Sequence, residues 1–97
     1  MNGVNKVLAF DTNRLDGKTD EELVQMVSYD EIATTTLITR YAKLIWVKAN
    51  KMANSPADAE DLAQEGLLGL LNAISKFDSS KNVRFATFAE VCINNKM

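Results

Sequence analysis

Three carboxylates of the chain recur at a spacing that could bind a basic partner. Asp58, Asp61 and Glu65 stand at positions i, i+3 and i+7, which fall on one face of a helix. Such an acidic stripe could meet Arg or Lys side chains on a partner helix. The simpler interpretation is an exposed helix face, on which charged residues are the norm. The spacing leaves both interpretations open.

The side chains that usually perform enzymatic catalysis are scarce. The chain has no His, which removes His-ligated metals, His general bases and the usual hydrolytic triads. Cys92 has no strongly basic neighbour other than Lys96, so we expect a small buried apolar residue rather than a nucleophile. No set of titratable residues resembles a catalytic constellation. We expect no enzymatic activity and no cofactor, and a small enzyme is the least favoured alternative.

The composition is that of one small globular domain. The 97 residues are 46% apolar and 25% charged, which excludes a wholly disordered or fibrous chain. Four Gly and one Pro are too few for the frequent turns of an all-β sandwich. No apolar run is long enough for a membrane span or a secretory signal. With its single cysteine, the sequence predicts a cytoplasmic protein that has no membrane partner.

Charge changes sign along the chain. Residues 31–53 carry four cations and one anion, residues 54–66 carry four anions and no cation, and residues 67–97 carry four cations and two anions. An acidic segment between two basic ones suggests two kinds of partner surface. Ordinary solvated helix faces would give a similar pattern.

Helix-start signals predict an all-α fold, a compact helical bundle of three substantial helices plus a short N-terminal helix. Capping boxes at residues 19–22 and 28–31 predict a short helix over residues 20–27 and a longer one after it. Ser55 followed by Pro56 opens a helix that runs to about Phe77. A last helix starts near residue 84 or 85. Residues 1–18 show no clear period and are predicted to be a loose N-terminal segment.

Apolar residues at helical spacing predict the core. In the two long helices they are Ile38, Tyr41, Ala42, Ile45, Ala49 and Met52, and then Leu62, Ala63, Gly66, Leu67, Leu70, Ile74 and Phe77. A glycine costs about 1 kcal/mol in a helix interior, so we expect close backbone approach at Gly66 and Gly69. Trp46 lies beside the stripe and is interpreted as a packing residue. Phe85 and Phe88 share a face, and we predict that Phe85 is core and Phe88 exposed.

Several motifs in order resemble region 2 of the bacterial sigma-70 family of transcription initiation factors. They are DAEDLAQEG at 58–66, LLGLLNAISKFD at 67–78 and RFATFA at 84–89. FAEVCI at 88–93 is most similar to the sigma-H-like branch. The resemblance implies a region 2 domain over residues 19–97 that is cut short in its last helix, and a longer factor of which this chain is one part.

The resemblance also implies two binding surfaces. One docks on the coiled coil of the RNA polymerase β′ clamp, and the matching residues are Asp58, Asp61, Gln64, Glu65, Leu68 and Leu71. The other recognises and helps to melt minus-ten promoter DNA and captures its non-template strand, and the matching residues are Lys76, Lys81, Arg84, Thr87, Phe88, Asn94 and Asn95. Phe88 could stack on a base, Lys81 and Arg84 could contact phosphates, and the asparagines match base-edge readers.

One departure and one alternative accompany this interpretation. The tryptophan pair that opens the DNA bubble in housekeeping members is replaced by Val91 and Cys92, which cannot stack as indoles do. The resemblance therefore implies either weaker melting or melting by another geometry that is specific to this branch. The alternative function is a helical protein-interaction module, bound chiefly by an anti-sigma factor and without DNA binding of its own. Such a module would show no salt-dependent preference for the minus-ten strand.

Overall fold

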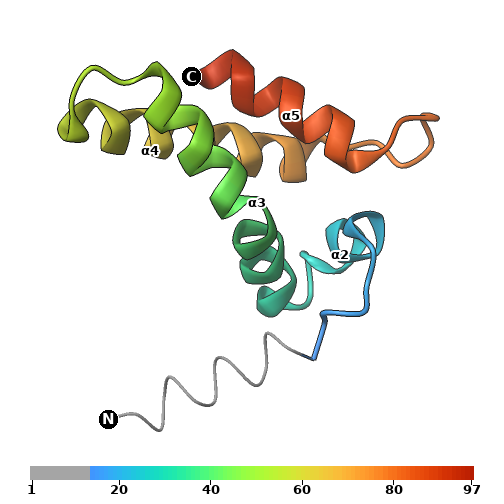
Figure 1. The fold of residues 1–97 in the computed structure, drawn as a ribbon. Helices are drawn as coiled ribbons and strands as arrows, with labels where there is room; N and C mark the ends of the chain where they lie inside the picture. Colours follow the sequence, from blue (N-terminus) through green and yellow to red (C-terminus); the bar gives the residue numbers. More distant parts are fainter. Residues whose placement is uncertain (1–13) are drawn as a thin grey trace, which may run out of the picture.

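The computed structural model describes residues 14–97, and over these residues the chain is helical and contains no strand. Its elements, labelled as in Figure 1, are α2 (Asp20–Met26), α3 (Glu31–Met52), α4 (Pro56–Lys76) and α5 (Phe85–Lys96). The all-α prediction of three substantial helices and a short leading one is confirmed for these residues. Of the predicted loose segment, residues 1–13 lie outside the described residues, and Leu15 is buried in the core.

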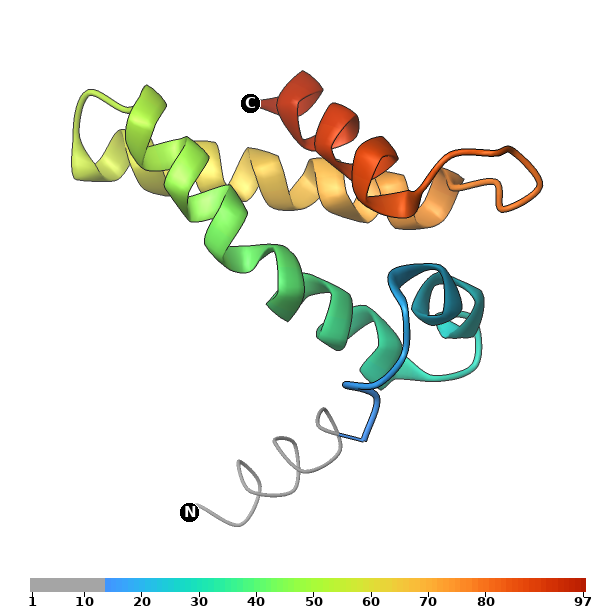
Figure 2. The ribbon, with the colours of Figure 1, turned by 45° about the vertical axis from the view of Figure 1, so that its right-hand side comes forward.

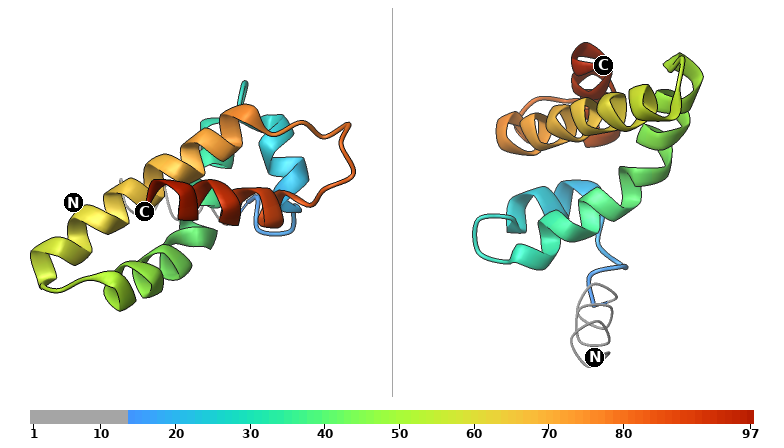
Figure 3. Two further views of the ribbon diagram at one scale, coloured as in Figure 1. Left: turned by 90° about the horizontal axis from the view of Figure 1, so that it is seen from above. Right: turned by 90° about the vertical axis from the view of Figure 1, so that its left-hand side faces the viewer.

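The helices form two joined layers. α4 and α5 lie side by side and run in opposite directions, connected by the loop of residues 77–84 (Figure 1). α3 begins away from α4 and runs toward it, so that its later turns pack against the first half of α4, and α2 packs on the N-terminal half of α3 (Figure 2). The views in Figure 3 show that α2 also approaches the start of α5. No helix of residues 14–97 combines the length and apolarity that crossing a bilayer would need.

The helix starts follow local capping chemistry. The Thr19 hydroxyl accepts the Glu22 N–H at 3.0 Å, and the Glu22 carboxylate accepts the Thr19 N–H at 2.8 Å, which completes the predicted capping box. The Ser55 hydroxyl accepts the Asp58 N–H at 3.1 Å, with Pro56 in the first helical turn. Both predictions are confirmed.

The predicted start of α3 is wrong by two residues. Asp30, and not Ser28, is the N-cap, and its carboxylate accepts the Ile32 N–H at 3.1 Å. The Met26 carbonyl accepts the Tyr29 and Asp30 N–H groups, so Ser28 lies within the turn that ends α2. The Arg14 guanidinium, 3.1 Å from Asp30, is hydrogen-bonded to this carboxyl and holds its pKa below the usual range.

Phe85 lies at the centre of the core. It is fully buried and meets the rings of Phe77 and Tyr41 edge to face, at centroid distances of 5.3 and 6.0 Å. Leu37, Leu70 and other buried residues surround it. The prediction that Phe85 is core is confirmed.

Two predicted packing residues are on the surface instead. Met52 is 51% exposed because the last turn of α3 runs past its neighbours before the chain reverses at residues 53–55. Trp46 is 45% exposed because it flanks, and does not join, the α3 stripe that faces α4. Cys92, predicted to be buried, is only half-buried.

The two helical glycines let helices approach, as predicted. A Cβ at Gly69 would stand 2.5 Å from the Cys92 carbonyl oxygen and 2.7 Å from the Ile93 Cα, both in the α5 backbone. At Gly66 it would meet side chains, the Met97 Sδ at 2.9 Å and the Ile45 Cγ2 at 3.0 Å. Gly69 is therefore a point of close contact between the α4 and α5 backbones.

Candidate functional site

The acidic stripe of α4 lies on a face that no other helix of residues 14–97 covers. Asp61, Gln64 and Glu65 are exposed, and Leu68 and Leu71 beside them are 49% and 36% exposed. Asp58 is half-buried, and its carboxylate accepts the Asn54 N–H at 3.1 Å, so this residue also holds the turn before α4. All six residues predicted to bind a partner thus lie on α4, and one of them, Asp58, also stabilises the turn before the helix.

A mostly apolar groove runs between α3 and α4, next to this face. It has a volume of about 350 Å³, and Trp46, Gln64 and Leu67 are among the residues that line it. The indole of Trp46 forms part of the wall of this groove. The residue was predicted to pack inside the fold, but it is partly exposed because the groove is open to solvent. The groove places a large apolar surface beside Gln64.

A second hollow, of about 200 Å³, lies at the loop of residues 77–84. Its lining combines two aromatic rings with cationic side chains and consists of Lys76, Phe77, Asp78, Lys81, Val83 and Phe88. Phe88 was predicted to be exposed but is half-buried, because its ring packs 5.9 Å from that of Phe77. What remains exposed of Phe88 faces this hollow.

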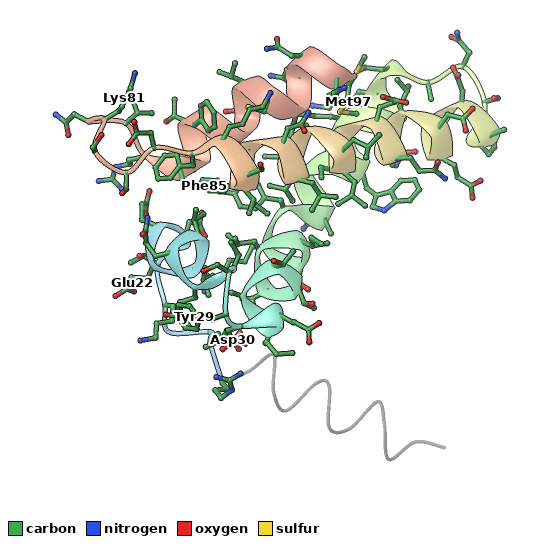
Figure 4. The ribbon with its side chains drawn as sticks, turned by 180° about the vertical axis from the view of Figure 1, so that it is seen from behind. Glu22, Tyr29, Asp30, Lys81, Phe85 and Met97 are labelled. Carbon is green, nitrogen blue, oxygen red and sulfur yellow. The ribbon has the colours of Figure 1, made fainter. Side chains whose placement is uncertain are left out.

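The loop that forms the hollow is an ordered turn. The Asp78 carboxylate accepts the Ser80 N–H at 2.9 Å and the Ser80 hydroxyl at 2.6 Å. These hydrogen bonds from Ser80 hold the pKa of Asp78 below its ordinary value, so the carboxylate stays charged at neutral pH. The Lys81 N–H donates to the Asp78 carbonyl at 3.1 Å, and Figure 4 shows Lys81 at the outer end of the loop.

The remaining predicted residues follow α5 away from the loop. Arg84 and Thr87 are exposed at its start, and Asn94 and Asn95 are exposed near its end. Thr87 and Asn94 are seven residues apart and therefore share a face of the helix, but about 10 Å separates them along its axis. The structure gathers the predicted cations and Phe88 around the loop, and leaves the asparagines at a distance.

Glu21 is a residue of this region that sequence reasoning missed. Its Oε2 accepts the backbone N–H of Phe85, the first residue of α5, at 2.6 Å, although 64 positions separate the two residues. Arg84, at the N-cap of α5, makes no side-chain capping bond. The sequence signal was the missing Ser, Thr, Asp or Asn before Phe85, which left the first turn of α5 in need of a distant acceptor.

A cluster of polar side chains connects α2, the helix that carries Glu21, to α3. The Arg40 guanidinium donates to Asp20 Oδ1 at 2.9 Å and to the Asp16 carbonyl at 3.0 Å. The Tyr41 hydroxyl donates to Asp20 Oδ2 at 2.5 Å. Burial, and then the hydrogen bond to Asp20, raises the pKa of the Tyr41 phenol, which is therefore uncharged at neutral pH. This cluster fixes the helix from which Glu21 projects.

Comparison with known proteins gives one family and a set of relatives. The family described as Sigma-70 region 2 matches residues 37–97. The RNA polymerase sigma-H factors of Bacillus licheniformis and Bacillus subtilis are 38% and 37% identical over 79 residues, covering 80% of this chain and 35% and 36% of those proteins. The sigma-E factor of Clostridium acetobutylicum is 33% identical over 78 residues, covering 80% of this chain and 33% of that protein.

The chain thus spans about a third of the length of these curated relatives. No solved structure matches it significantly.

Proposed function

The chain belongs to the sigma-70 family of bacterial RNA polymerase sigma factors, in which it matches region 2, and on that premise we propose that it is a promoter-specificity domain. One face binds core RNA polymerase and another binds minus-ten promoter DNA. It performs no chemistry itself, because nucleotidyl transfer belongs to the polymerase.

The exposed face of α4 is proposed to dock on the coiled coil of the β′ clamp. Its carboxylates, Asp61 and Glu65, can pair with basic side chains of a partner helix. Leu68 and Leu71 add apolar surface beside them, and an apolar centre with a polar rim is the usual anatomy of a protein interface.

Binding to the isolated β′ clamp coiled coil tests this docking. We expect Glu65→Lys to weaken binding by tenfold or more (about 1.4 kcal/mol), and Gln64→Ala to weaken it less. Glu31→Lys is the control, since Glu31 is equally exposed but lies in the first turn of α3. A wild-type chain with a native helical spectrum that does not bind, or an equal loss in the control, would contradict the proposal.

The hollow at residues 77–84 is the single observation that best supports DNA binding. It joins aromatic surface from Phe77 and Phe88 to the cations Lys76 and Lys81. Within residues 14–97, neither lysine nor the neighbouring Arg84 forms an ion pair, so their charges are available to phosphates. Stacking of an unpaired base on an aromatic ring contributes about 1–3 kcal/mol. These features suit a single strand, whose bases are accessible.

The DNA proposal is tested on the chain in complex with core RNA polymerase. The probe is a pool of short fluorescent single strands of random sequence, and the competitor is the same pool as duplex. We expect the complex to prefer single strands over duplex, to enrich one minus-ten-like sequence, and to lose affinity linearly in log salt. Equal binding by core polymerase alone would contradict the assignment to this chain.

A module bound chiefly by an anti-sigma factor is the second candidate function. The half-exposed Trp46 in the groove between α3 and α4 supports it, because aromatic residues are enriched at protein interfaces. This candidate predicts no single-strand preference in the DNA experiment above.

A further inference from the structure

Helix α5 depends on another helix for its first hydrogen bond. The Arg84 side chain at its N-cap makes no capping bond and has no acceptor to offer. The first N–H groups of a helix need acceptors from outside it. Glu21 of α2 supplies one, at 2.6 Å from the Phe85 nitrogen. A carboxylate in this place also complements the positive end of the helix dipole.

Two consecutive glutamates of α2 have different partners. Glu22 accepts the Thr19 N–H at 2.8 Å and closes the capping box of its own helix. Glu21 is half-buried and reaches across to α5. The two side chains carry the same charge in the same helical turn, so they form a natural test and control.

Glu21 stands beside the proposed DNA-binding cations. It lines a hollow of about 430 Å³ together with Lys81, Arg84 and other residues of the loop. By its charge alone, a carboxylate here repels phosphates, and its removal would strengthen DNA binding. By its hydrogen bond, it holds the first turn of α5, and its removal would weaken DNA binding. The two roles predict effects of opposite sign.

We infer that Glu21 is a positioning residue for DNA capture. By holding the Phe85 N–H, it fixes the turn that carries Arg84, Thr87 and Phe88 against the loop of residues 77–84. Glu21 itself does not contact the DNA. This inference rests on the proposed function and deepens it, because it assigns α2 a part in promoter recognition.

Two substitutions with the same charge change separate the roles. Glu21→Ala and Glu21→Gln both remove the negative charge, but glutamine keeps an oxygen that can accept the Phe85 N–H. With each variant bound to core RNA polymerase and single-stranded DNA as the probe, we expect Glu21→Ala to bind about tenfold more weakly. Glu21→Gln should bind as tightly as the wild type or more tightly. Glu22→Gln, the charge-matched control, should not weaken binding.

A third variant covers the case in which Glu21→Ala does not fold. Glu21→Asp keeps the charge but shortens the side chain by one methylene, so its oxygen falls short of the Phe85 nitrogen. We expect weaker DNA binding at unchanged charge. Unchanged binding by Glu21→Asp overturns the inference.

Two readouts separate positioning from general destabilisation. The amide proton resonance of Phe85 should move upfield in Glu21→Ala and stay near its wild-type position in Glu21→Gln. Affinity for the β′ clamp coiled coil, carried by α4, should be the same in all variants. DNA binding by Glu21→Ala as tight as the wild type, or equal losses in the alanine and glutamine variants, overturns the inference alone. A wild-type complex that binds the clamp but no DNA overturns the proposed DNA role, and this inference with it.

Discussion

The two candidate surfaces of this domain are built in different ways. The acidic face is presented by α4 alone, and the helical repeat fixes the mutual positions of Asp61, Gln64 and Glu65. The basic face is assembled from the end of α4, the loop of residues 77–84 and the start of α5, with one hydrogen bond from α2. A surface on one helix needs only that helix, whereas an assembled surface needs every contact that joins its parts.

The difference bears on which substitutions matter. On the acidic face, a change should affect little beyond the side chain that is replaced, because exposed positions contribute little to stability. On the basic face, residues that touch no partner, such as Phe85 and Glu21, decide whether the surface exists. The predictions below test this contrast, from the largest expected effect to the smallest.

Phe85→Ala should have the largest effect. The side chain is fully buried between the rings of Phe77 and Tyr41, and truncation of such a phenylalanine costs about 3–5 kcal/mol of unfolding free energy. Denaturant unfolding measures the loss. Phe88→Ala is the matched control, and it should cost less because Phe88 is only half-buried. Equal losses in the two variants would refute the assignment of Phe85 to the centre of the core.

Gly69→Ala should come next. Its Cβ would lie 2.5 Å from a backbone oxygen of α5, which cannot move aside as a side chain can, so we expect a loss of about 1–3 kcal/mol. At Gly66 the nearest atom is the flexible Met97 Sδ, and the helix propensity of alanine offsets part of the clash. Gly66→Ala should therefore be milder, and Gly17→Ala, with open space around it, should be nearly neutral. Thermal unfolding of the three variants checks this order.

Lys81→Ala should weaken DNA binding without changing the fold. The residue is exposed at the outer end of the loop, and loss of one phosphate contact to a single strand should reduce the magnitude of the negative slope of log affinity against log salt by about 0.7. Affinity for the β′ clamp should not change. A salt titration of the polymerase complex measures the slope, and an unchanged slope would remove Lys81 from the DNA surface.

Acidification should loosen the α2–α3 junction, which holds Glu22 and Asp30, before it affects the middle of α4; Asp78, whose pKa is also lowered, lies beyond the end of α4 in the loop of residues 77–84. The hydrogen bond from Thr19 lowers the pKa of Glu22 from 4.5, and Arg14 lowers that of Asp30 from 3.8. A lowered pKa stabilises the fold above the unfolded value, and the stabilisation is lost as pH falls through the folded value. The protection of α2 amides against hydrogen exchange, relative to the intrinsic rate at each pH, should therefore fall below about pH 4.5, while the protection of α4 amides persists. Asp30→Asn should make α2 less sensitive to acid, and an equal pH response of both helices would contradict this contrast.

Helix capping and helical periodicity predicted most of the helices, and they predicted that the acidic residues of α4 share one face. The boundaries of α2 and α4, the close approach at Gly69 and the common face of Asp61 and Glu65 all follow from capping chemistry and periodicity. Each of these features depends on residues within a few positions of one another. At Gly69 the glycine itself is the signal, because a glycine inside a helix costs stability unless it allows close packing.

The features that were missed depend on residues distant in sequence. The N-cap of α3 is Asp30, and Arg14, 16 positions earlier, donates a hydrogen bond to its carboxylate. The half-burial of Phe88 depends on the ring of Phe77, and the first hydrogen bond of α5 depends on Glu21. Periodicity also does not say where a helix outruns its neighbour, which is why Met52 was placed in the core.

The contact between α4 and α5 has a practical consequence. Cys92, whose carbonyl oxygen faces Gly69, is the one cysteine of the chain, and its side chain is half-buried. Its thiol is therefore the one native cysteine site at which a thiol reagent can probe the surroundings of this helix contact. The rate of its reaction with a thiol reagent, compared with the rate in the unfolded chain, measures how far the fold protects this position, without any engineered label.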